Sequence, residues 1–232
     1  MLPIAILAGG AATRLGTITR DVPKSLVDVA GRPFLVHQLE LLRSRGLEDV
    51  VVCVGHLGAQ IEAAIGDGSR WNMRVRYSYD GPQPLGTGGA LRRALPLLGP
   101  AFFVLYGDSY LDCDYVAVER ALLGGMHLAV LTVYRNEDRW DRSNVRCANG
   151  QIVRYSKSDQ TPDMQHIDYG LAALREQAML RYPDGEPLDL ARVYEDLVAA
   201  GELAPFEVTT RFFEIGTPAG LAETRAHLAK AC

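Results

Sequence analysis

The stretch Leu7-Ala8-Gly9-Gly10-Ala11-Ala12-Thr13-Arg14-Leu15-Gly16 is the most informative in the chain, because its glycines come directly after a short apolar run. That run, residues 4–8, is predicted to be a buried strand. Two glycines after a strand let the backbone turn tightly and present its N–H groups as an anion-binding nest. Arg14 can hold phosphate oxygens in a bidentate way, and Lys24 adds a mobile point charge. The stretch therefore predicts a phosphate-binding loop at the carboxyl end of the first strand.

This loop differs from the two commonest phosphate-binding patterns. The pattern G-x-x-x-x-G-K-[ST] is absent because Lys24 follows Pro23 and not a glycine, and G-x-G-x-x-G does not occur here. A glycine pair alone would indicate a plain turn with surface cations nearby. The addition of Thr13, Arg14, Pro23 and Lys24 favours the phosphate-binding interpretation.

The bulk composition is that of an ordinary globular chain. It has 232 residues, 48% of them hydrophobic, and a formal charge of −4, which fits one α/β domain and argues against a nucleic-acid binder. The four cysteines form no C-x-x-C pair, so a reducing compartment is favoured over a disulfide framework or a zinc site. The apolar N-terminus is too short for a membrane span and lacks the basic start of a signal peptide. We therefore expect a cytoplasmic protein with no membrane partner.

Short apolar runs alternate with amphipathic stretches through the first half of the chain. Helical spacing is clearest where Phe34, Leu35, Gln38, Leu39 and Leu42 repeat at intervals of three and four. The alternation of strands and helices implies right-handed crossovers and a mainly parallel sheet. Strands are predicted at 4–8, 50–54, 75–79 and 101–106, and helices at 34–45, 59–65 and 87–98.

The second half has a different pattern. Asn149-Gly150 lies between two alternating runs, which is a strong hairpin signal. We predict a single α/β domain, residues 1–232, with halves 1–125 and 126–232. Its Rossmann-like, mainly parallel mixed sheet is flanked by helices and gains a small antiparallel addition in the C-terminal half. Further strands are predicted at 128–134, 145–148 and 152–156, and further helices at 188–200 and 219–231.

Two further motifs place ligand-binding residue types at predicted strand ends. Pro84 to Ala90 opens a helix with glycines, which either cap the helix or let a flat base or a sugar approach closely. Asp108 follows a buried strand, where a carboxylate can hold Mg²⁺, an ion that typically takes one or two carboxylates plus phosphates. A helix cap is the alternative for Asp108, but the first loop favours metal binding. Asp112 and Asp114 are interpreted as solvated groups or as supports of the site, with metal binding as the alternative.

The first motif resembles the signature L-A-G-G-x-x-T-R-L…T…P-K of the sugar-1-phosphate nucleotidyltransferase family. The middle of the chain is similar to the N-acetylmuramate 1-phosphate uridylyltransferases, and Gly107-Asp108-Ser109-Tyr110 is similar to the heptose 1-phosphate guanylyltransferases. The resemblance implies that Arg14 holds the β- and γ-phosphates, that Lys24 holds the reacting α-phosphate, and that both are catalytic together with Asp108. It also implies that the nucleotide-binding half, 1–125, binds the nucleotide through Leu7, Ala8, Gly9, Gly10 and Thr13.

The second glycine segment is similar to a family segment, P-L-G-T-x-G-A, that contacts the nucleobase and the sugar. The resemblance gives Gly86 and Thr87 a role in nucleotide binding and Gly88 a role in sugar-phosphate binding. The polar residue just before this segment usually reads the base. Gln83 or Asp80 is therefore the candidate for that role.

Three positions in the sugar-phosphate-binding half, 126–232, resemble the family's acceptor and metal sites. Lys157 would contact the sugar phosphate, with a plain surface lysine as the alternative. Gly170 would let the sugar approach, with a bulge glycine as the alternative. Phe213-Glu214-Ile215-Gly216-Thr217-Pro218 resembles a late motif that normally offers an aspartate as the second metal ligand. Glu214 stands there instead, so the expected Mg²⁺ ligands are Asp108 and Glu214.

The expected reaction joins an NTP to a sugar 1-phosphate and releases pyrophosphate, as in nucleotide-sugar and cell-surface polysaccharide biosynthesis. GTP with heptose 1-phosphate is the preferred pair. UTP with a hexose or N-acetyl sugar 1-phosphate, CTP with a non-sugar phosphate, and a catalytically silent regulatory module are the alternatives. Because Arg14, Lys24 and Asp108 are all present, an enzyme is favoured over the silent module. A homo-oligomer is left open.

Overall fold

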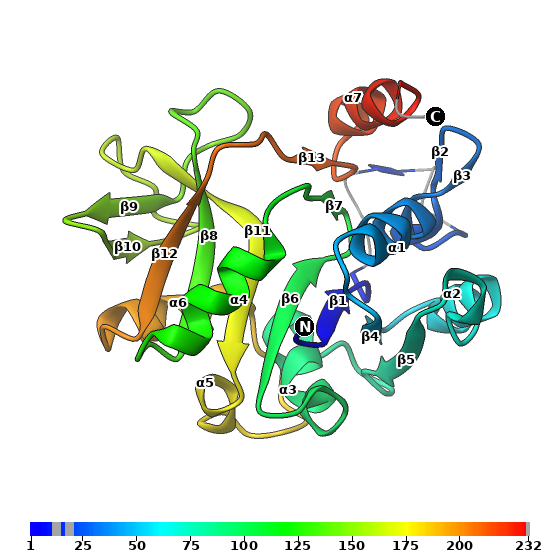
Figure 1. Cartoon of the computed structure of the whole chain (residues 1–232), viewed down its shortest axis with the longest axis horizontal. Helices are drawn as coiled ribbons and strands as arrows, with labels where there is room; N and C mark the ends of the chain where they lie inside the picture. The colour runs from blue at the N-terminus through cyan, green and yellow to red at the C-terminus, as the bar shows by residue number, and fades with distance from the viewer. Residues whose placement is uncertain (11–14, 17–20, 231–232) are drawn as a thin grey trace.

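A mixed sheet of nine strands runs through the centre of the part of the chain that the computed structural model describes, residues 1–10, 15–16 and 21–230 (Figure 1). Its strands are β1 (Ile4–Leu7), β4 (Asp49–Val54), β5 (Arg74–Tyr79), β6 (Ala101–Tyr106), β8 (Ala129–Arg135), β9 (Val145–Ala148), β10 (Gln151–Tyr155), β11 (His166–Arg175) and β12 (Leu203–Val208). Across the sheet the order is β10-β9-β11-β6-β1-β4-β5, while β8 lies beside β11 and β12 beside β8. Strands from both halves of the chain therefore share one sheet, joined where β6 meets β11.

Helices cover both faces of this sheet. One face carries α1 (Phe34–Ser44), α2 (Gly58–Ile65) and α4 (Tyr115–Gly124), and the other carries α3 (Gly86–Leu98), α5 (Gln177–Leu180) and α6 (Leu190–Ala199). The shorter elements are β2 (Asp28–Val29), β3 (Arg32–Pro33), β7 (Ser109–Tyr110), β13 (Phe213–Glu214) and the 3₁₀ helices η2 (Lys24–Leu26) and η3 (Ser69–Trp71). The last helix, α7 (Pro218–Leu228), packs on β13 and β2 and lies outside the two helical layers.

The two layers follow from the alternation of side chains along each strand. In β1, Ile4 and Ile6 face α1 and α2, whereas Ala5 faces α3. In β4, Val50 and Val52 belong to the first layer and Val51 to the second. Both faces of these strands are covered by helices, which explains why each strand is an unbroken apolar run.

The predicted fold class is confirmed. β1 pairs in parallel with both β4 and β6, and β4 pairs in parallel with β5. β9 and β10 form the predicted antiparallel hairpin. Asn149 and Gly150, between them, have φ values of 52° and 73°, which is the left-handed backbone that a tight hairpin turn requires.

Three of the longer elements have no counterpart among the predicted ones. β11 is buried along most of its length, but Asp168 and Gly170 interrupt its apolar pattern. β12 contains Pro205, which has no backbone N–H to donate. Proline is tolerated in an edge strand, and β12 pairs with β8 at the edge of the sheet. The third is α4, which begins after Asp114, whose carboxylate accepts a hydrogen bond from the backbone N–H of Ala117.

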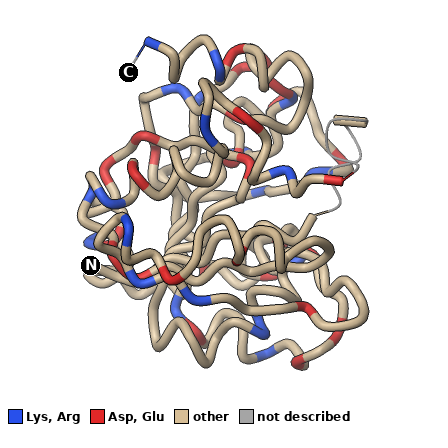
Figure 2. The backbone as a smooth tube through the Cα atoms, turned by 90° about the vertical axis from the view of Figure 1, so that its right-hand side faces the viewer, with Lys and Arg blue, Asp and Glu red and all other residues tan. Residues whose placement is uncertain are grey.

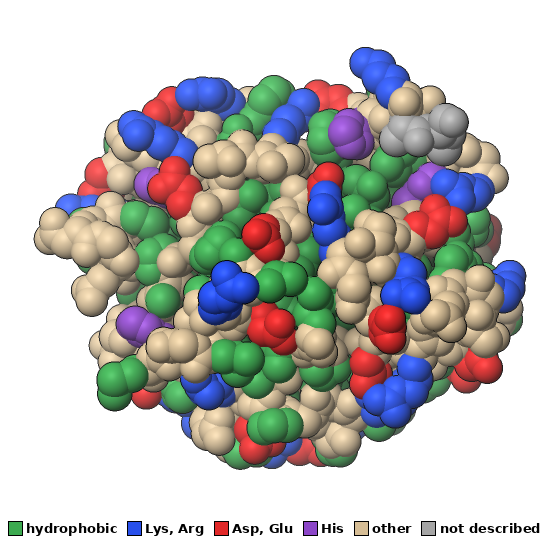
Figure 3. All heavy atoms as spheres, in the orientation of Figure 1, with side chains coloured by type: hydrophobic (Ala, Val, Ile, Leu, Met, Phe, Trp, Pro, Cys, Tyr) green, Lys and Arg blue, Asp and Glu red, His purple; other side chains and the backbone are tan. Residues whose placement is uncertain are grey.

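Charged residues of both signs are interspersed along the described chain, as the tube in Figure 2 shows. Hydrophobic side chains reach the surface near the middle of the face drawn in Figure 3, in the region of α4, where Val116 and Leu123 are exposed. None of the described helices is both long enough and apolar enough to span a membrane.

The cap on α4 leads to a first prediction. Asp114→Ala is expected to lower the free energy of unfolding by about 1 kcal/mol, because the first turn of the helix loses its side-chain acceptor. Asp112 is the matched control: it forms an ion pair with Arg45 in which both side chains are about half exposed, so Asp112→Ala should cost less than about 0.5 kcal/mol. Urea unfolding of the two variants measures both losses, and equal losses would contradict the capping role.

Candidate active site

A cavity of about 720 Å³ opens where β1, β4 and β6 end. The parallel register sets Leu7 beside Cys53 on one side and beside Tyr106 on the other, so the loops that follow these strands converge at one edge of the sheet. The residues that line the cavity are Leu7, Ala8, Gly9, Gly10, Lys24, Ser25, Cys53, Gly55, His56, Asp80, Gly81, Pro82, Pro84, Gly86, Thr87, Ala90, Tyr106, Gly107, Asp108 and Gly216. The two glycine segments and Asp108, which the sequence analysis singled out separately, therefore share one cavity.

Glycines allow these loops to pack backbone against backbone. A Cβ atom on Gly9 would lie 3.0 Å from the backbone nitrogen of Gly55, and one on Gly107 would lie 2.7 Å from the carbonyl oxygen of Leu7. The Gly107 N–H instead donates a hydrogen bond of 3.0 Å to that oxygen. The missing side chains thus bring the loops after β1, β4 and β6 together and leave backbone groups at the wall of the cavity.

Lys24 and Asp108 form an ion pair inside the cavity. Nζ of Lys24 lies 2.5 Å from Oδ2 of Asp108, and the two side chains are 16% and 25% exposed. Gln38 fixes the turn that carries Asp108: its Nε2 donates to the carbonyl oxygens of Tyr106, at 3.1 Å, and Ser109, at 2.7 Å. Gln38 therefore holds the turn from which the Asp108 carboxylate meets the Lys24 ammonium group in the cavity.

Glu214 is held next to Asp108 by the backbone. β13 pairs antiparallel with β7, so that Glu214 faces Ser109, and the N–H of Ile215 donates to the Asp108 carbonyl oxygen at 2.9 Å. The two carboxylates and the Lys24 ammonium group surround Gly216, where an added Cβ would lie 3.4 Å from Oε1 of Glu214, 3.6 Å from Oδ2 of Asp108 and 3.4 Å from Nζ of Lys24. Two carboxylates beside a cavity that can admit phosphates are the ligand set that Mg²⁺ commonly takes from a protein, so these residues fit the ion.

Asp80 is a buried carboxylate at the wall of the same cavity. Its Oδ2 accepts a hydrogen bond of 3.3 Å from the Leu85 N–H, and its Oδ1 has no hydrogen-bond partner. Burial raises the pKa of Asp80, while Leu85 and Arg93 act in the opposite direction. Of the two candidate base readers, Asp80 lines the cavity, whereas Gln83 is exposed and does not belong to its lining.

Lys157 reaches the cavity wall from the second half of the chain. Its Nζ donates a hydrogen bond of 3.2 Å to the hydroxyl of Tyr106 and lies 4.9 Å from the centre of that ring. Asp168 is nearby and accepts hydrogen bonds from the Tyr155 hydroxyl, at 3.0 Å, and from the Gly170 N–H, at 2.9 Å. Burial raises the pKa of Asp168, and the charge of Lys157 opposes that shift. A cation and a carboxylate therefore lie beside Tyr106, where the two halves of the chain meet.

The remaining predicted residues lie in several environments. Gly170 has a φ of 99° and sits where the pairing of β11 with β8 is irregular. This is the position of a bulge glycine, the alternative to a sugar-binding role. Gly88 packs on Leu188, and its N–H donates to the Leu188 carbonyl oxygen at 2.8 Å, away from the cavity lining. Thr87 does line the cavity, and its hydroxyl accepts a hydrogen bond from the N–H of Leu190. Thr13 and Arg14 lie outside the described residues.

Gln38 and Tyr106 are site residues that the sequence analysis did not identify. Gln38 had a visible signal, since it is a polar residue within the apolar stripe of a predicted helix. Buried polar groups need partners, so its amide had to reach a polar segment nearby. Tyr106 had no such signal, because an aromatic residue at the end of a buried strand is ordinary core composition.

Known proteins similar to this chain include two that are named as nucleotidyltransferases of sugar 1-phosphates. N-acetylmuramate alpha-1-phosphate uridylyltransferase of Neisseria meningitidis is 41% identical over 113 residues, which cover 48% of this chain and 49% of that protein. D-glycero-alpha-D-manno-heptose 1-phosphate guanylyltransferase of Campylobacter jejuni is 34% identical over 109 residues, or 47% of this chain and 48% of that protein. The chain thus spans about half the length of these curated relatives.

Solved structures share the fold. HddC from Yersinia pseudotuberculosis superposes with a TM-score of 0.82 at 24% identity, covering 98% of this chain and 100% of that one. The same protein complexed with GMP-PN gives a TM-score of 0.81 at 24% identity, with the same coverage. The model of the nucleotidyl transferase family matches residues 4–136, which is more than half of the chain. The chain therefore belongs to the nucleotidyl transferase family, as its resemblance to the sugar-1-phosphate nucleotidyltransferases predicted.

Proposed function

We propose that this chain transfers a nucleoside monophosphate from an NTP to a sugar 1-phosphate and releases pyrophosphate. The observation that carries the proposal is the cavity at the ends of β1, β4 and β6, in which Gly9 and Gly10 lie together with the paired Lys24 and Asp108. Membership of the nucleotidyl transferase family and the names of the relatives support the same reaction. The proposal assigns nucleotide binding to this cavity and acceptor binding to the adjoining Lys157 region.

The reaction is a direct displacement at phosphorus. An anionic phosphate oxygen of the sugar 1-phosphate attacks the α-phosphorus of the triphosphate and forms a new P–O bond. The bond between the α-phosphorus and the oxygen that bridges to the β-phosphate breaks, and pyrophosphate leaves with that electron pair. Because the nucleophile is already negatively charged, no residue has to remove a proton. Catalysis then consists of positioning and charge neutralisation.

The residues of the cavity supply both the positioning and the charge neutralisation. The ammonium group of Lys24, held 2.5 Å from the Asp108 carboxylate, can contact an α-phosphate placed against the Gly9-Gly10 loop. Mg²⁺ on Asp108 and Glu214 would neutralise charge that develops on the transferring and leaving phosphates. By resemblance, Arg14 contributes to the β- and γ-phosphates. Lys157, next to Tyr106, would bind the phosphate of the acceptor sugar.

The buried Asp80 supports GTP as the nucleotide. Ionised carboxylate oxygens accept hydrogen bonds and donate none, so Asp80 suits a base edge with adjacent donors. Guanine offers its N1–H and its exocyclic amino group side by side, whereas uracil and thymine place a single N–H between two acceptors. The name of the Campylobacter jejuni relative, a heptose 1-phosphate guanylyltransferase, supports the same base and heptose 1-phosphate as the acceptor. The 41% identity to a uridylyltransferase favours UTP as the second candidate.

Pyrophosphate release provides the test of the reaction. The protein is mixed with Mg²⁺, each of several NTPs and each of several sugar 1-phosphates, and we expect the fastest release with GTP and a heptose 1-phosphate. Lys24→Ala and Asp108→Asn should each lower turnover by roughly a hundredfold or more, because each removes an electrostatic stabiliser of the transition state.

The matched controls for these variants are Lys230→Ala and Asp112→Asn, which change an exposed lysine and a half-exposed aspartate that do not line the cavity. Both controls should retain wild-type turnover. Near-normal activity of Lys24→Ala or Asp108→Asn would overturn the roles given to those residues. An absence of pyrophosphate release with every pair would instead favour a catalytically silent module.

Base selection has a separate test. Asp80→Asn should lower kcat/KM for GTP by about tenfold to a hundredfold, since a hydrogen bond to a charged group contributes about 1.5–3 kcal/mol and each 1.4 kcal/mol is about tenfold. Gln83→Ala, at the exposed alternative position, should leave kcat/KM for GTP within about twofold. Initial rates over a range of GTP and UTP concentrations measure both. If Gln83→Ala gives the large loss and Asp80→Asn does not, the base reader is Gln83.

A further inference from the structure

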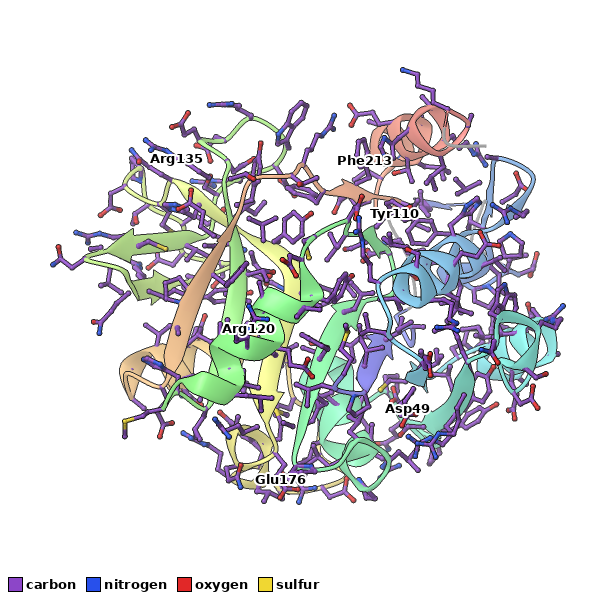
Figure 4. The ribbon with its side chains drawn as sticks, viewed as in Figure 1. Asp49, Tyr110, Arg120, Arg135, Glu176 and Phe213 are labelled. Atoms are coloured by element: carbon purple, nitrogen blue, oxygen red, sulfur yellow. The ribbon has the colours of Figure 1, made fainter. Side chains whose placement is uncertain are left out.

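Phe213, the residue before Glu214, belongs to a cluster of stacked side chains on the upper side of the molecule as drawn in Figure 4. The guanidinium carbon of Arg211 lies 3.4 Å from the centre of the Trp140 ring and 4.9 Å from the centre of the Phe213 ring. The ring of His227 stacks on Phe213 with centres 3.9 Å apart and an interplanar angle of 15°. Trp140, Arg211, Phe213 and His227 are called the ring cluster below. In Figure 4, Phe213 lies near Tyr110 and below α7.

The ring cluster joins segments that are far apart in the sequence. Trp140 lies in the loop between β8 and β9, Arg211 lies between β12 and β13, and His227 lies on α7. The loop is fixed from inside by the fully buried Asn136, whose side chain bonds to the N–H of Trp140, at 3.2 Å, and to other groups of the loop. Arg211 is also paired with Glu223 of α7. The ring cluster therefore packs the segment leading into β13 between the β8–β9 loop and α7.

Glu214 depends on this segment for its position. β13 has only two residues and pairs with the two residues of β7, so few ladder hydrogen bonds hold it. Phe212, the residue before β13, is anchored in the core. The centre of its ring lies 6.2 Å from that of Tyr134 and 6.1 Å from that of Tyr169. Phe213 packs separately, in the ring cluster. The hydroxyl of Thr224 adds one hydrogen bond of 2.9 Å to the Glu214 carbonyl oxygen.

A glutamate needs such support more than an aspartate does. Its side chain has one more rotatable bond, and ordering a glutamate side chain costs up to about 1.5–2 kcal/mol of rotamer entropy. Fixing the backbone on both sides of Glu214 limits the region that its carboxylate can sample beside Asp108. Groups that orient metal ligands in this way typically change metal affinity by about 10- to 100-fold when they are removed.

We propose that the ring cluster is a positioning device for Glu214, and that Trp140, Arg211 and Phe213 set the affinity of the site for a divalent cation without touching the ion or the substrates. The inference rests on the proposed function in that it takes Asp108 and Glu214 as the metal ligands. It assigns the β8–β9 loop a role in metal binding, although this loop contributes no residue to the cavity lining.

The test uses Phe213→Leu, which removes the stacked ring but keeps an apolar side chain, and Phe213→Tyr, which keeps the ring. Retention of Mn²⁺, as a stand-in for Mg²⁺, is measured by equilibrium dialysis with a non-hydrolysable GTP analogue and no sugar phosphate, corrected for Mn²⁺ bound by the analogue alone. We expect Phe213→Leu to weaken Mn²⁺ binding by about tenfold and Phe213→Tyr to stay within about twofold of wild type. The Mg²⁺ concentration for half-maximal pyrophosphate release should change in parallel.

Trp140→Leu is the second variant, because Trp140 is 44% exposed and lies outside the core, so that its replacement leaves the protein folded even if Phe213→Leu does not. It should weaken Mn²⁺ retention in the same direction. Wild-type Mn²⁺ affinity in the folded leucine variants would overturn the inference and leave the proposed function intact if wild-type protein releases pyrophosphate. A wild-type protein that retains no Mn²⁺ would overturn the metal assignment on which the inference rests. If wild-type protein retains Mn²⁺ but releases no pyrophosphate, that result counts against the proposed function and not against the metal-positioning role of the ring cluster.

Discussion

β1 pairs in parallel with a strand on each side, and this pairing sets where the loops of the candidate site leave the sheet. Because β1 lies between β4 and β6 in matched register, three chain segments leave the sheet at the same edge and must pass close to one another. Gly9 and Gly107 make this close passage possible, since a side chain at either position would meet backbone atoms of a neighbouring loop. The cavity is the space that these loops enclose, so the site and the sheet register have the same origin.

A second constraint joins the middle of the chain to its C-terminal segment. Asp108 follows the central strand β6, whereas Glu214 comes from a two-residue strand just before the last helix. The pairing of β7 with β13 and the hydrogen bond from Ile215 to Asp108 bring these carboxylates together. The proposed metal site therefore forms only when the C-terminal segment has docked. Glu214 stands where the resembling motif normally has an aspartate, and its longer side chain makes the position of its carboxylate depend on the backbone of that segment.

The cavity also divides the proposed reaction between the two halves of the chain. The nucleotide side is built from loops of the first half, including the buried Asp80. The acceptor side is reached by Lys157, which rests on Tyr106 at the end of β6. Tyr106 is thus the shared wall between the two substrates in the proposed arrangement.

The parallel strands and the hairpin at Asn149-Gly150 could be predicted from the sequence alone, because periodicity and turn chemistry are local properties. The structure was needed to show that Asp108 faces the cavity, that Asp80 and not Gln83 lines it, and that Gly170 sits at a bulge of β11. It also decided that Gln38 holds the Asp108 turn and that Phe213 joins the ring cluster. These outcomes depend on which distant segments pack against each residue, and no local pattern in the chain encodes that.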